Sequence, residues 1–176
     1  RLLNVDLAGK PCGRLTHGSS YVFQYGRDDP QQPSLSLLMP ANALKYEDGA
    51  LFPAMDMNLP EGFLFQQIRE MFPKQSLTPM HLLALMGDNG IGRIGYALPE
   101  RARPVPSSLV SKQDLLHATN GKNVFQDLMR AYLSTGAGIS GIQPKIMVPD
   151  RATIPVPTLI VKVSAPRYAD LAANEF

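Results

Sequence analysis

The sequence predicts an α+β fold that opens with a small β-rich N-terminal subdomain also carrying helices. Turn residues separate three strand-like runs within residues 1–25, and Tyr21, Phe23 and Tyr25 alternate as in a strand with one buried face. After Asn58 the period changes, and apolar residues recur at helical spacing. The 16 prolines among 176 residues favour short elements joined by stiff connections.

The first hundred residues contain the clearest elements. Three strands are expected in residues 1–25, with turns at 9–11 and 17–19, and a further edge strand in "SLSLLMP" (34–40). "LPEGFLFQQIREMF" (59–72) predicts a helix. Thr78 and Pro79 are typical of an N-cap and first helical position, and Gly87 would end that helix. "GRIGYAL" (92–98) is expected to be a strand.

A boundary between subdomains is predicted at "PERARPVPSS" (99–108), which is rich in proline and arginine and has no periodicity. We therefore divide the chain into residues 1–100, a linker at 101–110, and residues 111–176. In the last part, residues 121–136 predict a helix, "KIMV" (145–148) and "TLIVKV" (158–163) predict strands, and a further helix is expected to begin near the end.

Composition excludes several classes of protein. A formal net charge of +2 is too weak to indicate nucleic-acid binding, and no apolar run approaches the ~18–20 residues that span a bilayer. The single cysteine, Cys12, excludes an internal disulfide and favours a cytoplasmic location. With three scattered histidines, we expect no metal site.

The stretch "TGAGISGIQPK" (135–145) is the main chemical candidate. Its glycines either turn a corner or let backbone N–H groups surround phosphate oxygens. No Gly-Lys-Ser/Thr closes the run and a strand follows it, so it is not a P-loop. Ser140 has no histidine or acid beside it in sequence, which argues against a hydrolase nucleophile.

Two later residues have two interpretations each. Lys162, on the second strand after the glycines, is either a cation that reaches phosphates or a lysine extending from a strand into solvent. Glu175 either pairs with that lysine from the final helix or is a solvated surface residue. The turn-rich stretches at 56–62 and 85–96 are interpreted as structural.

In combination and order, these motifs resemble the HipA family of bacterial toxin kinases. "SLSLLMP", "LFPAMDMNLPEGFL" and "LLALMGDNGIGRIGY" are similar to the family's first subdomain, and "GISGIQPKIMV", "TLIVKV" and "LAANEF" to the start of its kinase domain. The resemblance implies an incomplete protein-kinase-like N-lobe after the first subdomain. It also implies an ATP site formed by residues Gly138, Ser140, Gly141, Gln143, Lys145, Lys162 and Glu175.

The resemblance further implies a serine/threonine protein kinase that uses ATP and Mg²⁺. Its partners would be a helix-turn-helix antitoxin (HipB-like), a protein substrate such as an aminoacyl-tRNA synthetase, and DNA only through the antitoxin. Gly138 stands where many relatives carry an autophosphorylated serine, so autophosphorylation would fall on Ser140. The catalytic and metal-binding aspartates are expected after Phe176. We therefore expect a piece of a longer protein, inactive alone. The alternative is an interaction module that docks or neutralises a toxin kinase without catalysing a reaction.

Overall fold

A computed structural model of the chain describes residues 1–26, 31–88, 90, 92–99, 110–117, 127–129, 138–139, 145–148, 150 and 158–162. The chain forms two compact units. The first comprises Arg1–Leu59 and Thr78–Arg103, and the second comprises Pro60–Leu77 and Pro104–Phe176. The linker predicted at 101–110 lies, except for residue 110, outside the described residues.

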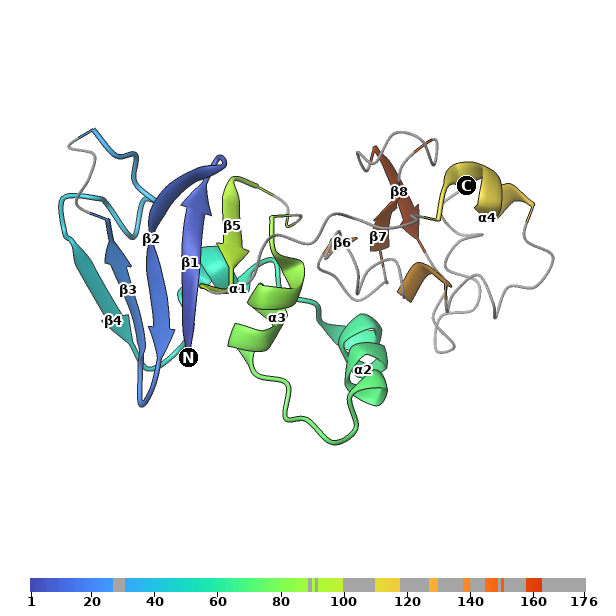
Figure 1. Ribbon diagram of the computed structural model, residues 1–176, viewed down its shortest axis with the longest axis horizontal. Coiled ribbons are helices and arrows are strands. Elements are labelled where there is room, and N and C mark those ends of the chain that lie inside the picture. Colours follow the sequence, from blue (N-terminus) through green and yellow to red (C-terminus); the bar gives the residue numbers. More distant parts are fainter. Residues whose placement is uncertain are drawn as a thin grey trace. The chain divides into compact units, whose positions relative to one another are not determined.

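The first unit is built on a five-stranded antiparallel sheet of order β4-β3-β2-β1-β5 (Figure 1). The strands are β1 (Leu2–Leu7), β2 (Lys10–His17), β3 (Tyr21–Tyr25), β4 (Lys45–Asp48) and β5 (Ile94–Ala97). Leu3, Leu15 and Phe23 face one another on three neighbouring strands and are almost completely buried. The alternation of Tyr21, Phe23 and Tyr25 therefore marks the core face, as predicted.

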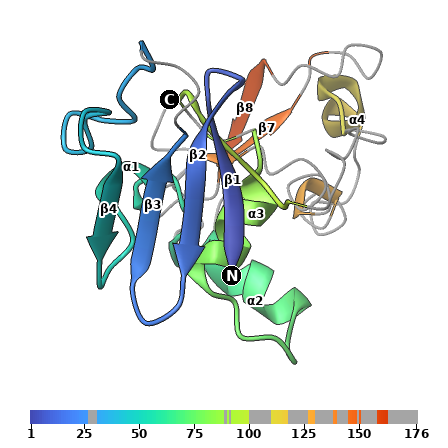
Figure 2. The ribbon, with the colours of Figure 1, turned by 60° about the vertical axis from the view of Figure 1, so that its left-hand side comes forward.

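Two short helices lie on this same face of the sheet, α1 (Pro53–Asp56) and α3 (Pro79–Met86), as Figures 1 and 2 show. The predicted cap of α3 is confirmed: Thr78 is the N-cap, Pro79 follows it, and Gly87 is the C-cap at φ 56°. The backbone N–H of Thr78 donates to Nδ1 of His81 at 3.0 Å. Four apolar side chains of α3 are buried: Met80, Leu82, Leu83 and Met86.

A β-bulge at Cys12 interrupts the pairing of β1 with β2. Val5 pairs with Gly13 and Asp6 with Pro11, so that Cys12 is the extra residue. Its side chain is buried, and burial raises the pKa of the thiol. Gly13 is required beside the bulge, since a Cβ there would lie 2.3 Å from the backbone oxygen of Gln24 and 2.8 Å from the ring of Phe23.

The edge strand predicted in residues 34–40 is wrong. The segment forms a turn in which Met39 N–H donates to the oxygen of Ser36 at 3.1 Å, and it exposes Leu37 at its tip. The Tyr25 hydroxyl holds this turn from inside the unit. It accepts from the Leu35 N–H at 2.7 Å and donates to the carbonyl of Met39. The segment forms a turn rather than a strand because the two hydrogen bonds of the Tyr25 hydroxyl satisfy buried backbone groups that a lone edge strand would leave unpaired.

The second unit contains α2 (Gly62–Met71), α4 (Lys112–Leu116) and a three-stranded sheet. The helix predicted in residues 59–72 is thus confirmed, with Leu64 and Ile68 buried one turn apart. In α4, the Ser111 side chain accepts from the backbone N–H of Asp114, whose carboxylate accepts in return from Ser111 N–H at 2.8 Å. The Ser111 hydroxyl also donates to the Asp114 carboxylate at 2.7 Å, and this bond, followed by the one from the Ser111 N–H, lowers the pKa of Asp114.

Other expectations can be compared only in part. The strand predicted at 92–98 is confirmed as β5. Residues 127–129 are helical, but the rest of the helix predicted for 121–136 and the final helix lie outside the described residues. In the ranges that are described, no helix is long and apolar enough to cross a membrane.

Candidate functional site

The three-stranded sheet of the second unit carries the chemical candidates. It consists of β6 (Gly138–Ile139), β7 (Lys145–Val148) and β8 (Leu159–Lys162), paired antiparallel in the order β6-β7-β8 (Figure 1). Residues 140–144 of the glycine-rich stretch therefore connect two neighbouring antiparallel strands. The strands predicted at 145–148 and 158–163 are confirmed as β7 and β8.

The register brings two lysines together at the end of the sheet where this connection lies. Lys145, the first residue of β7, pairs with Ile139 of β6 and with Lys162 of β8. Directly opposed residues of neighbouring strands share a face, so the Lys145 and Lys162 side chains are neighbours. Like charges in directly opposed positions disfavour strand pairing unless other groups offset them.

The two faces of this sheet differ in burial. Ile146 and Val148 alternate with the lysine position and are 0% and 1% exposed. On the lysine face, Met147 pairs with Ile160, and Ile160 is 54% exposed. One face is therefore packed, whereas the other carries two cations near the glycine-rich connection and an open apolar pair further along.

Only some of the predicted site residues lie in the part of the chain that the structure describes. It brings Gly138, Lys145 and Lys162 into one sheet, while Ser140, Gly141, Gln143 and Glu175 lie outside the described residues. The prediction did not include Met147 and Ile160. Their signal was present in the strand period, since Ile160 lies two residues before Lys162 and Met147 two after Lys145.

Groups that could bind a metal are not assembled in the described part of the chain. Within it, no three His, Cys, Asp or Glu side chains are grouped so that they could hold an ion. The described residues of the three-stranded sheet supply cations and apolar side chains, which suit a phosphate-bearing ligand rather than a cation.

The first unit is thus an α+β domain with a five-stranded antiparallel sheet covered on one face by two short helices, and a second sheet carrying paired lysines follows it in the chain. The family model described as the HipA N-terminal domain matches residues 3–97, more than half of the chain. The chain therefore belongs to the HipA N-terminal domain family.

Among solved structures, the chain is similar to one described as the "N-terminal domain of HipA toxin". The two share 22% sequence identity with a TM-score of 0.41, and the match covers 58% of this chain and 95% of the other. No curated protein matches the sequence.

Proposed function

We propose that this chain is the N-terminal part of a HipA-like serine/threonine protein kinase toxin of the cytoplasm, which transfers the γ-phosphoryl group of ATP to a hydroxyl of a protein target. Family membership through residues 3–97 supports the assignment to a HipA-like toxin. The kinase activity rests on the second unit, and the observation that carries it is the register of its sheet.

Three features of that sheet fit a nucleotide. A glycine-rich connection joins β6 and β7, a lysine lies on the next strand, and the register puts that lysine at the same end of the sheet as the connection. A phosphate-covering loop and a fixed lysine on a neighbouring strand are the parts that hold ATP in protein kinases.

In the proposed reaction, Lys145 and Lys162 hold phosphate oxygens, and backbone N–H groups of residues 140–144 bind from the loop side. The adenine ring would lie further along the same face, against Met147 and Ile160. The lysines offset the negative charge that develops during transfer and fix the geometry of the phosphates. Most of the catalytic effect of these residues would therefore come from position and charge.

The remaining parts of the reaction belong to the parent protein. We assign to it the catalytic base and the carboxylates that hold Mg²⁺, as the resemblance to the HipA kinases implies. Glu175 is proposed to pair with Lys162. A helix-turn-helix antitoxin would restrain the toxin, and an aminoacyl-tRNA synthetase is the proposed substrate.

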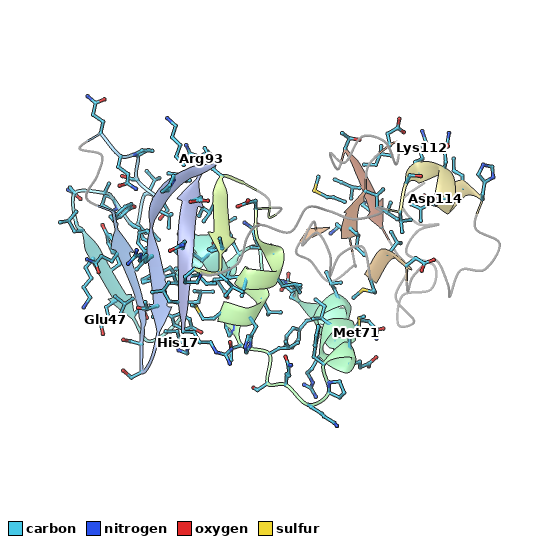
Figure 3. All side chains as sticks on the ribbon, in the orientation of Figure 1. His17, Glu47, Met71, Arg93, Lys112 and Asp114 are labelled. Atoms are coloured by element: carbon cyan, nitrogen blue, oxygen red, sulfur yellow. The ribbon has the colours of Figure 1, made fainter. Side chains whose placement is uncertain are left out.

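The test compares two lysines of the second unit in the parent protein. We expect Lys162→Met to lower autophosphorylation and target phosphorylation at least ~100-fold. The control is Lys112→Met on α4 (Figure 3), where the exposed side chain makes a 3.6 Å ion pair with Asp150 that contributes little to stability. Equal activity of the Lys162→Met variant and the wild type, with ATP affinity unchanged, would refute the proposed site.

A second candidate function is an interaction module that docks or neutralises a toxin kinase. The observation in its favour is that the family match ends at Ala97, close to the end of the first unit at Arg103. That unit has a buried core of its own around Leu3, Leu15 and Phe23. Adding the 176-residue chain to an active HipA-like kinase distinguishes the two: stoichiometric inhibition supports the module, and no effect supports the kinase part.

A further inference from the structure

The face of the five-stranded sheet turned away from α1 and α3 carries a row of polar side chains. Asn4, Arg14, Gln24 and Lys45 are successive register partners on β1, β2, β3 and β4. Their Cβ atoms are therefore about 5 Å apart from strand to strand. Because the helices lie on the other face, no helix of the first unit's described residues covers this row (Figure 2).

Part of this row lines a hollow of about 730 Å³ that the bulge helps to form. Asn4, Arg14 and Gln24 line it, together with Pro11 and with Gln32, whose side-chain amide donates to the carbonyl of Cys12 at 2.5 Å. That bond fixes the Gln32 side chain against the extra residue of β2. A hollow of this size with a few convergent polar groups has the dimensions of a binding site.

The two cations of the row, Lys45 and Arg14, differ in whether they form an ion pair. Lys45 is paired with Glu47 at 2.9 Å. The exposed side chain of Arg14 has no hydrogen-bond or ion-pair partner among the described residues, and neither has the half-buried side chain of Asn4 or the exposed side chain of Gln24. The hollow therefore offers one unpaired guanidinium between two side-chain amides, all of which can donate to the same anionic group.

This arrangement suits a carboxylate better than a phosphate backbone. A guanidinium binds a carboxylate through two parallel hydrogen bonds, and the flanking amides supply further donors. Among the described residues that line the hollow, Arg14 is the single cation and Asp6 is a carboxylate, whereas a phosphate backbone is bound by several cations in a row. Tyr25 also lines the hollow, but it is only 3% exposed, so its ring could not stack a base as the binding of single-stranded nucleic acids requires.

We propose that this hollow binds an acidic side chain of an extended peptide segment from a partner protein. The carboxylate lies between Arg14 and the amides of Asn4 and Gln24, and the methylene groups of the acidic residue contact Pro11. The site lies in the first unit, so it does not depend on the proposed kinase function.

The test uses the 176-residue chain labelled with ¹⁵N and a hexapeptide of alternating glutamate and alanine, acetylated and amidated at its ends. We expect saturable NMR shifts confined to Asn4, Arg14 and Gln24, including the Arg14 Nε–H signal. The same peptide with glutamine in place of glutamate should bind about tenfold more weakly or worse, because it loses the charge-assisted pair.

Two variants and one further probe complete the experiment. Arg14→Gln should lower affinity at least about tenfold, whereas Arg93→Gln, at an exposed position outside the hollow, should leave it within about twofold (Figure 3). Inorganic phosphate at the same concentration should not produce the same shifts. Equal binding by Arg14→Gln, shifts spread over all exposed cations, or an equal response to phosphate would each overturn the proposal.

Discussion

Replacing Gly13 by alanine should destabilise the first unit far more than a glycine substitution normally does. Gly13 pairs with Val5 on one side and Tyr25 on the other, in the centre of the sheet. The new methyl group would lie 2.3 Å from the backbone oxygen of Gln24, about 1 Å closer than the ~3.5 Å at which non-bonded heavy atoms rest. It would also lie 2.8 Å from the Phe23 ring.

Neither the Gln24 oxygen nor the Phe23 ring can move away without a cost in free energy. The oxygen of Gln24 belongs to the paired backbone of β3, and Phe23 is 0% exposed. Overpacking of this kind costs about 3 kcal/mol. For a unit of this size each kcal/mol lowers Tm by about 4–8 °C, so the expected decrease is about 12–24 °C.

The measurement is thermal unfolding of the 176-residue chain, followed by the near-ultraviolet circular dichroism of its tyrosines. Gly49→Ala is the matched control, because a Cβ at Gly49 meets nothing within 4 Å. It should change stability by no more than about 0.5 kcal/mol. If the two variants unfold within 3 °C of each other (about 0.5 kcal/mol), the close packing of β2 against β3 described here is incorrect.

Two further predictions concern hydrogen bonds. Tyr25→Phe leaves the buried Leu35 N–H without its acceptor and should lower the free energy of unfolding, measured in urea, by about 1–3 kcal/mol. Tyr46→Phe loses an exposed bond to Pro40 and should lower it by less than about 1 kcal/mol, and the reverse order would contradict the anchoring of the turn by Tyr25. The pKa of Asp114 is lower in the folded chain than in the unfolded chain. The Asp114 carboxylate therefore stabilises α4 fully above the pKa of an unfolded aspartate, about 3.9, and this stabilisation is lost as the pH falls through the lower folded pKa. Hydrogen exchange at the Ser111 amide should accelerate over that acid range in the wild type relative to Asp114→Asn, and identical pH profiles would exclude the cap.

Sequence patterns predicted those elements whose signals are local. The alternation in β3, the helical spacing in α2 and the cap at Thr78 are each contained within a few residues. The turn at residues 34–40 was mistaken for a strand because its conformation depends on the Tyr25 hydroxyl, ten residues before Leu35. β4 was missed because "KYED" contains mostly residues that disfavour strands. α4 could have been found from the spacing of Ser111 and Asp114, which is typical of a capping box.

The candidate site likewise contains features that the sequence predicted and features that it could not predict. Family resemblance singled out Lys162 and the glycine-rich stretch, and each lies on or next to a strand of the second unit. The pairing of Lys145 with Lys162 could not be predicted, because register depends on the ten residues between β7 and β8 as well as on the strands. The polar row could not be predicted from the sequence either, since its members come from four strands and only the register aligns them.

The bulge at Cys12 also affects how relatives of this chain should be aligned. Because the side-chain period of a strand is two, the extra residue changes the numbering of β2 without changing which side chains face the core on either side of it. A relative that lacks the bulge would be one residue shorter here and keep the same sheet. An alignment without a gap at position 12 would then shift part of β2 by one residue, setting core positions against solvent-facing ones. A single gap of this kind therefore decides which residue of a relative corresponds to Arg14.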